Sequence, residues 1–189
     1  MFELKKFQVP PDFRGRSSFI VQLWWCVQAT LFTWSPQFMY SWRVFLLRLF
    51  GAKIGQGVII RPSVRITYPW KVAIGDYSWI GDDVVLYSLG EISIGSNSIV
   101  SQKSYLCTGS HDYDSQTFDI YAKPIIIGDG CWLATDVFVA PDITIGDGCV
   151  VGARSSVFHS LPANSICRGN PAIKIRDRDI VDINKGNNK

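Results

Sequence analysis

An aliphatic residue returns every six positions over much of this sequence. From Ile127 the phase holds without slip to Val157, and the intervening positions supply Gly, Asp, Asn and Pro, which form turns. An α-helix has 3.6 residues per turn and would spread a six-residue period around its surface. The pattern therefore predicts short strands separated by corners.

The pair Ile-Gly divides this repeat into larger intervals. It occurs at Ile54-Gly55, Ile74-Gly75, Ile94-Gly95, Ile127-Gly128 and Ile145-Gly146. Three six-residue units make one triangular coil of 18 residues, and such coils stack at about the 4.8 Å spacing of neighbouring strands. We therefore expect an all-β solenoid, a parallel β-helix of about five coils, over residues 51–162.

One interval is too long for a regular solenoid. The intervals that start at Ile54 and Ile74 are 20 residues each, two more than one coil, whereas 33 residues separate Ile94 from Ile127. About 15 residues must leave the prism in that interval, and we place the excursion at residues 108–124. Long excursions from a regular scaffold are commonly functional.

Both ends of the chain differ from the repeat. Residues 1–50 form a Trp-rich lead-in, whose apolar run is interrupted by Pro36 and predicts two short helices. Residues 163–189 are expected to leave the solenoid as a C-terminal tail with a frayed polar end.

The apolar lead-in has three interpretations. Its first run has about 16 residues, fewer than the roughly 20 needed to cross a bilayer. We favour packing against the solenoid or its oligomer, and association with a membrane interface through residues 17–50 or a true anchor stay open as alternatives. The favoured interpretation predicts that most of the indoles at Trp24, Trp25, Trp34 and Trp42 are buried in a soluble trimer.

Composition narrows the class of protein. The 189 residues suffice for one domain, and 47% hydrophobic with 19% charged residues excludes a disordered chain. A formal charge of +3 is too small to indicate a basic surface that binds nucleic acid. Five cysteines without a CxxC pair favour reduced thiols in the cytoplasm. We expect Cys131 and Cys149, one coil apart, to form a buried stack rather than to act as nucleophiles.

Three sequence features together resemble a known family. They are the repeated [ILV]-G-x-x-[small]-x units, the excursion TGSHDYD and the closing GNPAIKIR. The chain is similar to hexapeptide-repeat acyltransferases with a left-handed parallel β-helix, and most of all to the colanic-acid-type branch of the maltose and galactoside O-acetyltransferase group. The resemblance implies a homotrimer with active sites between subunits. It also implies acetyl-CoA as cosubstrate, no metal, a sugar or glycan acceptor, and a location in the cytoplasm or at the cytoplasmic membrane face.

His111, in the excursion, is the candidate catalytic base. An acetyl thioester is already activated, so the enzyme has to take a proton from the attacking hydroxyl, and neutral imidazole does this near pH 7. The alternatives are a loop histidine bonded to a neighbouring Asp, and a metal site formed with Asp112 and Asp114. A metal site needs more protein ligands than this cluster contains. His159, near the last coil, is interpreted as a solvated edge residue, and a minor role near the coenzyme stays open because relatives place a basic residue there.

The resemblance also assigns coenzyme contacts by matched position. The backbone N–H of Thr135 is expected to face the thioester carbonyl as an oxyanion donor. The other matched positions are Trp132, Ala134, Gly152, Ala153, Arg154, Lys174 and Arg176. Lys174 and Arg176 match a basic tail that meets coenzyme phosphates, although a solvated surface charge stays open for each cation.

The acceptor site is assigned from three residues. Asp83 stands where sugar acetyltransferases of this group carry an Asn that contacts the acceptor, which leaves the acceptor's identity open. Tyr87 and Tyr113 are included for their hydrogen-bonding groups alone. We therefore expect an O-acetyltransferase of exopolysaccharide or surface-glycan biosynthesis. An N-acetyltransferase of an amino-sugar nucleotide and a non-catalytic structural trimer are the alternatives, whereas a γ-type carbonic anhydrase needs three histidines per site and this chain has two.

Overall fold

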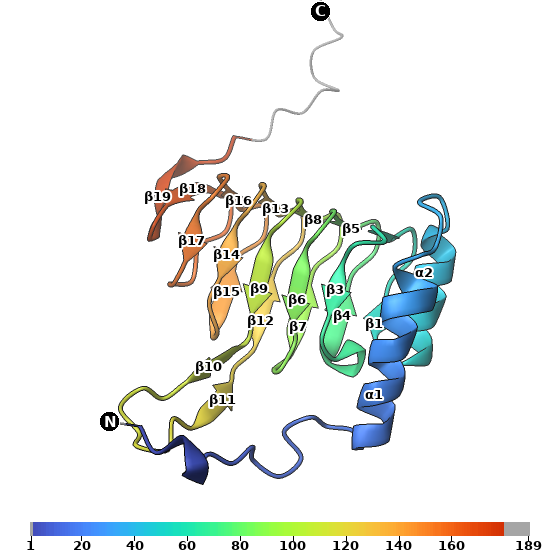
Figure 1. Cartoon of the computed structure of the whole chain (residues 1–189). Coiled ribbons are helices and arrows are strands. Elements are labelled where there is room, and N and C mark those ends of the chain that lie inside the picture. The colour runs from blue at the N-terminus through green and yellow to red at the C-terminus, as the bar shows by residue number, and fades with distance from the viewer. Residues whose placement is uncertain (1, 180–189) are drawn as a thin grey trace, which may run out of the picture.

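The computed structural model describes residues 2–179, and most of them form a three-sided parallel β-helix (Figure 1). Sheet A contains β1 (Lys53–Ile54), β4 (Val72–Ile74), β7 (Ile92–Ile94), β12 (Ile125–Ile127) and β15 (Ile143–Ile145). Sheet B contains β2 (Ile59–Ile60), β5 (Trp79–Ile80), β8 (Ile99–Val100), β13 (Trp132–Leu133), β16 (Val150–Val151), β18 (Ser165–Gly169) and β19 (Ala172–Asp177). Sheet C contains β3 (Arg65–Ile66), β6 (Val85–Tyr87), β9 (Tyr105–Cys107), β14 (Phe138–Val139) and β17 (Ser156–Val157).

The six-residue phase survives in three dimensions as columns of stacked side chains. In sheet A the isoleucines of the five Ile-Gly pairs are register partners from one coil to the next. In sheet B the inward residues have no exposed surface, and they are Ile60, Ile80, Val100, Leu133 and Val151. Burial of such aliphatic side chains stabilises the prism by about 25 cal/mol per Å² of apolar surface. The predicted solenoid is confirmed.

The solenoid has five complete coils and the beginning of a sixth. Leu161 forms a parallel bridge with Ile145, and β18 then pairs in parallel with β16. Strand β19 turns back and pairs antiparallel with β18, which extends sheet B. The expectation that the chain leaves the solenoid after residue 162 is therefore wrong for Ser165–Asp177. The frayed end predicted for the tail falls on residues 180–189, which lie outside the described part of the chain.

The predicted excursion leaves the prism between β9 of sheet C and β12 of sheet A. It is a β-hairpin rather than an irregular loop, formed by β10 (Gly109–His111) and β11 (Ile120–Ala122). His111 pairs with Ile120 at the outer end of this ladder. Figure 1 shows the hairpin projecting from the side of the prism near its middle coils.

Two helices cover the end of the solenoid where the first coil lies (Figure 1). They are α1 (Ser18–Val27), which continues as the π-helical turn η2 (Gln28–Phe32), and α2 (Tyr40–Leu49). The short 3-10 helices η1 (Leu4–Lys6) and η3 (Pro69–Lys71) lie outside this pair. Among residues 2–179, no helix is long and apolar enough to cross a membrane.

The helix pair buries only part of its aromatic surface. Trp24 is fully buried, and its indole N–H donates to the carbonyl of Ile66 over 2.8 Å. By contrast Trp25 is 45% exposed and Trp34 is 83% exposed. These two indoles are therefore exposed in the single chain, and the burial of most of the four indoles in the trimer stays a prediction.

The N-terminal segment before α1 forms an arm that ties the helices to the hairpin. Near α1, the indole N–H of Trp70 donates to the carbonyl of Arg14 over 2.7 Å. Near the hairpin, the N–H of Glu3 donates to the carbonyl of Gln116 over 2.8 Å, and the rings of Phe2 and Phe118 are 4.8 Å apart. The periodicity of the sequence gives no sign of this contact.

Candidate active site

The ring of His111 is held in one orientation by the hairpin and the arm. Its Nδ1 atom lies 2.9 Å from the carbonyl oxygen of Phe118. The imidazole stacks on the Phe118 ring, with centroids 4.2 Å apart and planes 10° apart, and the Phe7 ring of the arm lies 5.9 Å away. Because a carbonyl can only accept, Nδ1 carries the hydrogen, and in the neutral ring Nε2 is the basic atom.

The acidic residues near His111 organise the hairpin tip and do not bond its ring. Asp112 accepts from the backbone N–H groups of Asp114 and Ser115. Asp119 accepts from the hydroxyls of Thr117 and Ser115, and these hydrogen bonds lower the pKa of its carboxyl. A carbonyl thus orients His111, so the alternative of a histidine bonded to a neighbouring Asp is wrong. Within residues 2–179 no group of three or more His, Cys, Asp and Glu could hold a metal ion.

Two of the predicted acceptor residues lie on the same side of the molecule as His111. Tyr87 is half-buried on the outer face of sheet C, against the base of the hairpin at Gly109, and burial raises the pKa of its hydroxyl. Tyr113 is 75% exposed in the hairpin tip. We call this region, where sheets C and A meet, the His111 corner.

The predicted coenzyme residues gather along a different corner, where sheets B and C meet. The N–H of Arg154 donates to the carbonyl of Thr135 over 2.9 Å, and this hydrogen bond joins two consecutive coils. The Trp132 indole lies exposed on sheet B beside Thr135. No hydrogen bond joins the N–H of Thr135 to another residue of the described range 2–179. Thr135 is partly exposed, so its N–H at this Thr135 corner is a candidate donor at the position that the resemblance assigns to the oxyanion. Its residues are Trp132, Ala134, Thr135, Gly152, Ala153 and Arg154.

The predicted phosphate-binding cations extend the same side of the prism. Lys174 and Arg176 lie on β19, at the edge of sheet B. Their ion pairs are local, with Asp177 at 2.6 Å and Asp179 at 3.8 Å, and all four side chains are at least 41% exposed. Exposed ion pairs contribute little to stability, so these cations can exchange a carboxylate for a phosphate at little cost.

Asp83 is not brought together with the two tyrosines predicted to contact the acceptor. It occupies the corner between sheets B and C in an early coil, at a positive φ of 57°, and its N–H donates to the hydroxyl oxygen of Ser63 over 2.9 Å. Asp83 therefore lies along the same edge of the prism as the Thr135 corner, whereas Tyr87 and Tyr113 lie at the His111 corner.

The two corners lie on opposite edges of sheet C. His111 projects from the edge that sheet C shares with sheet A, and Thr135 sits at the edge that it shares with sheet B. One chain therefore separates the candidate base His111 from the candidate oxyanion donor Thr135 by the width of a prism face.

Two groups that position His111 were absent from the sequence-based prediction. Phe118 contributes both a carbonyl and a stacking ring, and Phe7 closes the other side. Aromatic residues inside an otherwise polar hairpin and inside the lead-in are the only signals in the sequence that could have pointed to them.

The buried cysteines do not contribute a nucleophile. Cys131 is 1% exposed and Cys149 has no exposed surface, so the predicted buried stack is confirmed. Burial raises the pKa of Cys131, and it raises that of Cys149 to about 12. Both thiols therefore stay protonated near neutral pH.

A β-helix of hexapeptide repeats with one histidine-bearing hairpin defines the class of hexapeptide transferases. The bacterial transferase hexapeptide family (six repeats) matches residues 124–159. WcaF of Escherichia coli K12, which is named as an acetyltransferase of colanic acid biosynthesis, is 70% identical over 178 residues, 94% of this chain and 98% of WcaF. The chain therefore belongs to the colanic-acid-type, WcaF-like branch of the hexapeptide-repeat acetyltransferases.

Solved structures share the whole fold at low sequence identity. A maltose O-acetyltransferase from Clostridium difficile 630 superposes with a TM-score of 0.80 at 24% identity, covering 95% of this chain and 99% of that chain. The acetyltransferase VCA0836 of Vibrio cholerae, in complex with acetyl coenzyme A, superposes with a TM-score of 0.78 at 24% identity, covering 88% and 92%.

Proposed function

We propose that this chain transfers an acetyl group from acetyl-CoA to a sugar hydroxyl in the cytoplasmic synthesis of an exopolysaccharide or surface glycan. The observation that carries the proposal is the hydrogen bond from His111 to the carbonyl of Phe118, which makes Nε2 the basic atom. The relative of 70% identity is named for acetyl transfer in colanic acid biosynthesis, and the two structural neighbours are an O-acetyltransferase and an acetyl-CoA complex.

The reaction follows from the two corners. Nε2 of His111 accepts the proton of the acceptor hydroxyl as the oxygen attacks the thioester carbon. The N–H of Thr135 donates to the oxyanion of the tetrahedral intermediate. Collapse of that intermediate breaks the carbon–sulfur bond, and the departing thiolate takes the proton from the imidazolium. The products are the O-acetyl sugar and CoA, and no covalent acyl-enzyme forms.

This reaction requires a second copy of the chain, because one copy holds the base and the oxyanion donor at different corners. We infer a homotrimer in which the His111 corner of one copy faces the Thr135 corner of the next. Three-fold closure gives each copy one partner on either side and makes three equivalent sites.

Release of CoA in the presence of candidate acceptors tests the proposed function. The purified chain is incubated with acetyl-CoA and a panel of glycans and amino-sugar nucleotides, and free thiol is followed together with product mass. We expect thiol release that depends on an acceptor with a free hydroxyl, and an acetylated product that mild base hydrolyses. A base-stable amide would instead identify an N-acetyltransferase, and failure to bind acetyl-CoA at all would identify a structural trimer.

Mixed oligomers test the inter-subunit site. His111→Ala removes the base, and Ala153→Trp places a bulky ring on the exposed Thr135 corner. Each variant alone is expected to be inactive. Co-expressed in equal amounts, the two chains should recover about one quarter of wild-type activity, since that fraction of interfaces joins two intact corners in random trimers. Mixtures as inactive as the parents would show that each site lies within one chain.

The basic edge of sheet B gives a separate prediction about the coenzyme. Lys174→Ala combined with Arg176→Ala is expected to raise KM for acetyl-CoA by about tenfold, and to weaken its dependence on salt, with a smaller change in kcat. Steady-state kinetics over a range of ionic strength measures both effects. Lys53→Ala, which removes an exposed cation from β1 of sheet A, serves as the control. An unchanged KM in the double variant would return Lys174 and Arg176 to ordinary surface charges.

A further inference from the structure

The faces of α1 and α2 that point away from the solenoid are apolar and exposed. The exposed fractions are 74% for Phe19, 42% for Leu23, 52% for Phe45 and 67% for Leu49. Within each helix the two residues are four positions apart, so they lie on one face. We call these four residues, together with the exposed Trp34 and Phe38 of the connection between the helices, the end face.

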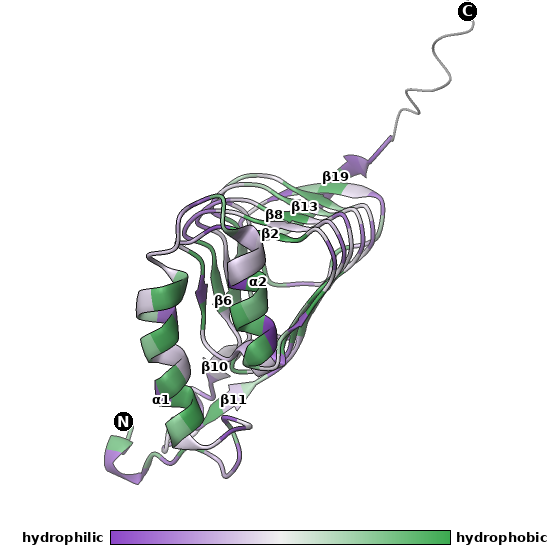
Figure 2. Ribbon diagram, turned by 90° about the vertical axis from the view of Figure 1, so that its right-hand side faces the viewer, coloured by the Kyte–Doolittle hydropathy of each residue, from purple (hydrophilic) through white to green (hydrophobic). Residues whose placement is uncertain are grey.

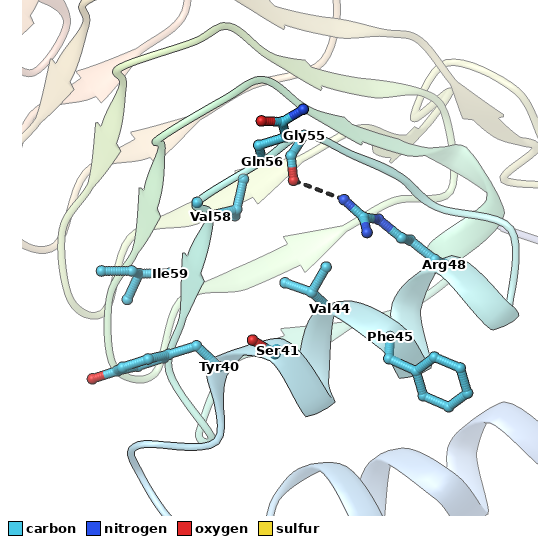
Figure 3. A pocket seen from close by; sticks show the side chains of 10 residues that line it. Tyr40, Ser41, Val44, Phe45, Arg48, Gly55, Gln56, Val58 and Ile59 are labelled. Atoms are coloured by element: carbon cyan, nitrogen blue, oxygen red, sulfur yellow. Dashed lines mark hydrogen bonds between the residues drawn. The ribbon is translucent and has the colours of Figure 1, made fainter.

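The direction of this face follows from what the opposite face buries. Trp24 of α1 and Leu47 of α2 are fully buried in the core of the first coil. Figure 3 shows Arg48 turned toward Gly55 of that coil, where it donates to the carbonyl oxygen over 2.9 Å, and Phe45 lines the same pocket with a ring that is 52% exposed. Figure 2 looks onto this end of the prism, with hydrophobic residues along much of both helices. The end face is therefore the outer surface of one end of the molecule.

Positive charge stands beside the end face. Between Asp12 and Asp76 the sequence contains eight Lys and Arg and no acidic residue. Arg14 donates to the hydroxyl of Ser18 at the first turn of α1, over 3.2 Å. A guanidinium nitrogen of Arg16 lies 3.7 Å from the Cβ position of Gly51, just beyond α2. Both cations thus flank the apolar residues at the ends of the two helices.

We propose that the end face docks on an anionic lipid bilayer. Apolar and aromatic side chains on an interfacial helix enter the boundary between headgroups and acyl chains, and flanking Arg and Lys attract anionic headgroups. Each helix has ten residues and is about 15 Å long, so the pair lies flat in the interface. A two-fold contact with a second copy would instead set Arg14 and Arg16 near their own equivalents, with no acidic residue in the segment to pair with them. In this arrangement the helix pair lies between the membrane and the solenoid. The sequence favours packing on the solenoid for the lead-in, and membrane binding by its outer face is added to that packing.

Sedimentation with vesicles tests the proposal on the full chain. We expect binding to vesicles of phosphatidylcholine with about 30% phosphatidylglycerol, and much weaker binding to phosphatidylcholine alone. Replacing Phe19, Leu23, Phe45 and Leu49 together by Gln should lower the affinity by roughly 100-fold or more. The control is Ile173→Gln with Ile175→Gln, which removes two residues that are 61% and 47% exposed at the opposite end of the solenoid. This control should bind like the wild type.

The charge contribution is measured separately. Arg14→Gln with Arg16→Gln should weaken binding to anionic vesicles by roughly tenfold or more, and leave binding to neutral vesicles unchanged. Quenching of wild-type Trp fluorescence by brominated lipid gives a readout that needs no variant, because it reports indoles inside the bilayer.

Three outcomes would overturn the proposal. They are wild-type protein that stays in the supernatant with no quenching, an Ile173/Ile175 control that loses as much binding as the end-face variant, and an end-face variant whose oligomeric mass falls without vesicles. The last outcome would show that another copy covers the face. Circular dichroism verifies that each variant is folded, and it keeps this test independent of the proposed reaction.

Discussion

His111→Ala is expected to lower kcat for acetyl transfer by about 10²- to 10⁴-fold, with the affinity for acetyl-CoA nearly unchanged. The reason is that Nε2 interacts with the moving proton only in the transition state, whereas the coenzyme is proposed to bind along the Thr135 corner. Steady-state kinetics gives kcat, and equilibrium titration with CoA gives the affinity. The same variant should keep its fold, because the ring lies on a hairpin outside the core of the prism.

His159→Ala is the matched control for this prediction. His159 is the other histidine of the chain, and it lies exposed after β17, away from the hairpin. Its removal should change kcat by less than about twofold. A His111→Ala variant that retained more than a third of wild-type kcat would contradict the assignment of the base, and an equal loss in both variants would mean that the two histidines act together.

Arg43→Ala should lower the free energy of unfolding by about 3–5 kcal/mol, the largest stability effect expected of a single charged residue here. The side chain has no exposed surface. It donates to the carbonyls of Ile60, Pro36 and Gln37 and to the hydroxyl of Ser35, over 2.6–3.0 Å. Burial lowers the pKa of the guanidinium, yet arginine side chains keep their charge in proteins. Truncation would leave four buried or half-buried acceptors without their donor.

Urea unfolding followed by circular dichroism measures this change, with Arg16→Ala as the control. Arg16 is exposed, so its replacement should alter the free energy of unfolding by no more than about 0.5 kcal/mol. If both variants unfolded at the same urea concentration, Arg43 would not be the link that fastens the helix pair to the first coil.

The coiled body of this protein could be predicted from the sequence because its determinants are local. In each six-residue unit the aliphatic residue points into the core, and Gly or Asp forms the corner between units. The sequence of every unit therefore determines its own conformation. Ile94 and Ile127 remain partners even though a hairpin separates them, since the phase resumes after the excursion. The same local signal marked the excursion itself and the histidine within it. It also implied a buried stack for Cys131 and Cys149, since both occupy the same position in consecutive coils.

The six-residue period alone predicted the coil architecture, the place of the hairpin and the columns of core side chains. It could do so because inward and outward positions follow from the spacing of residues along the chain. Only the tertiary structure decided what holds His111. Its partner is the backbone carbonyl of Phe118, seven residues away in the sequence. The register of the hairpin brings the two together, and the six-residue repeat does not extend into the hairpin. The arm contact of Phe7, the exposure of Trp25 and Trp34, and the fold-back of β19 were decided in the same way. Each depends on which surfaces meet after folding, and surface packing between distant segments leaves no period in the sequence.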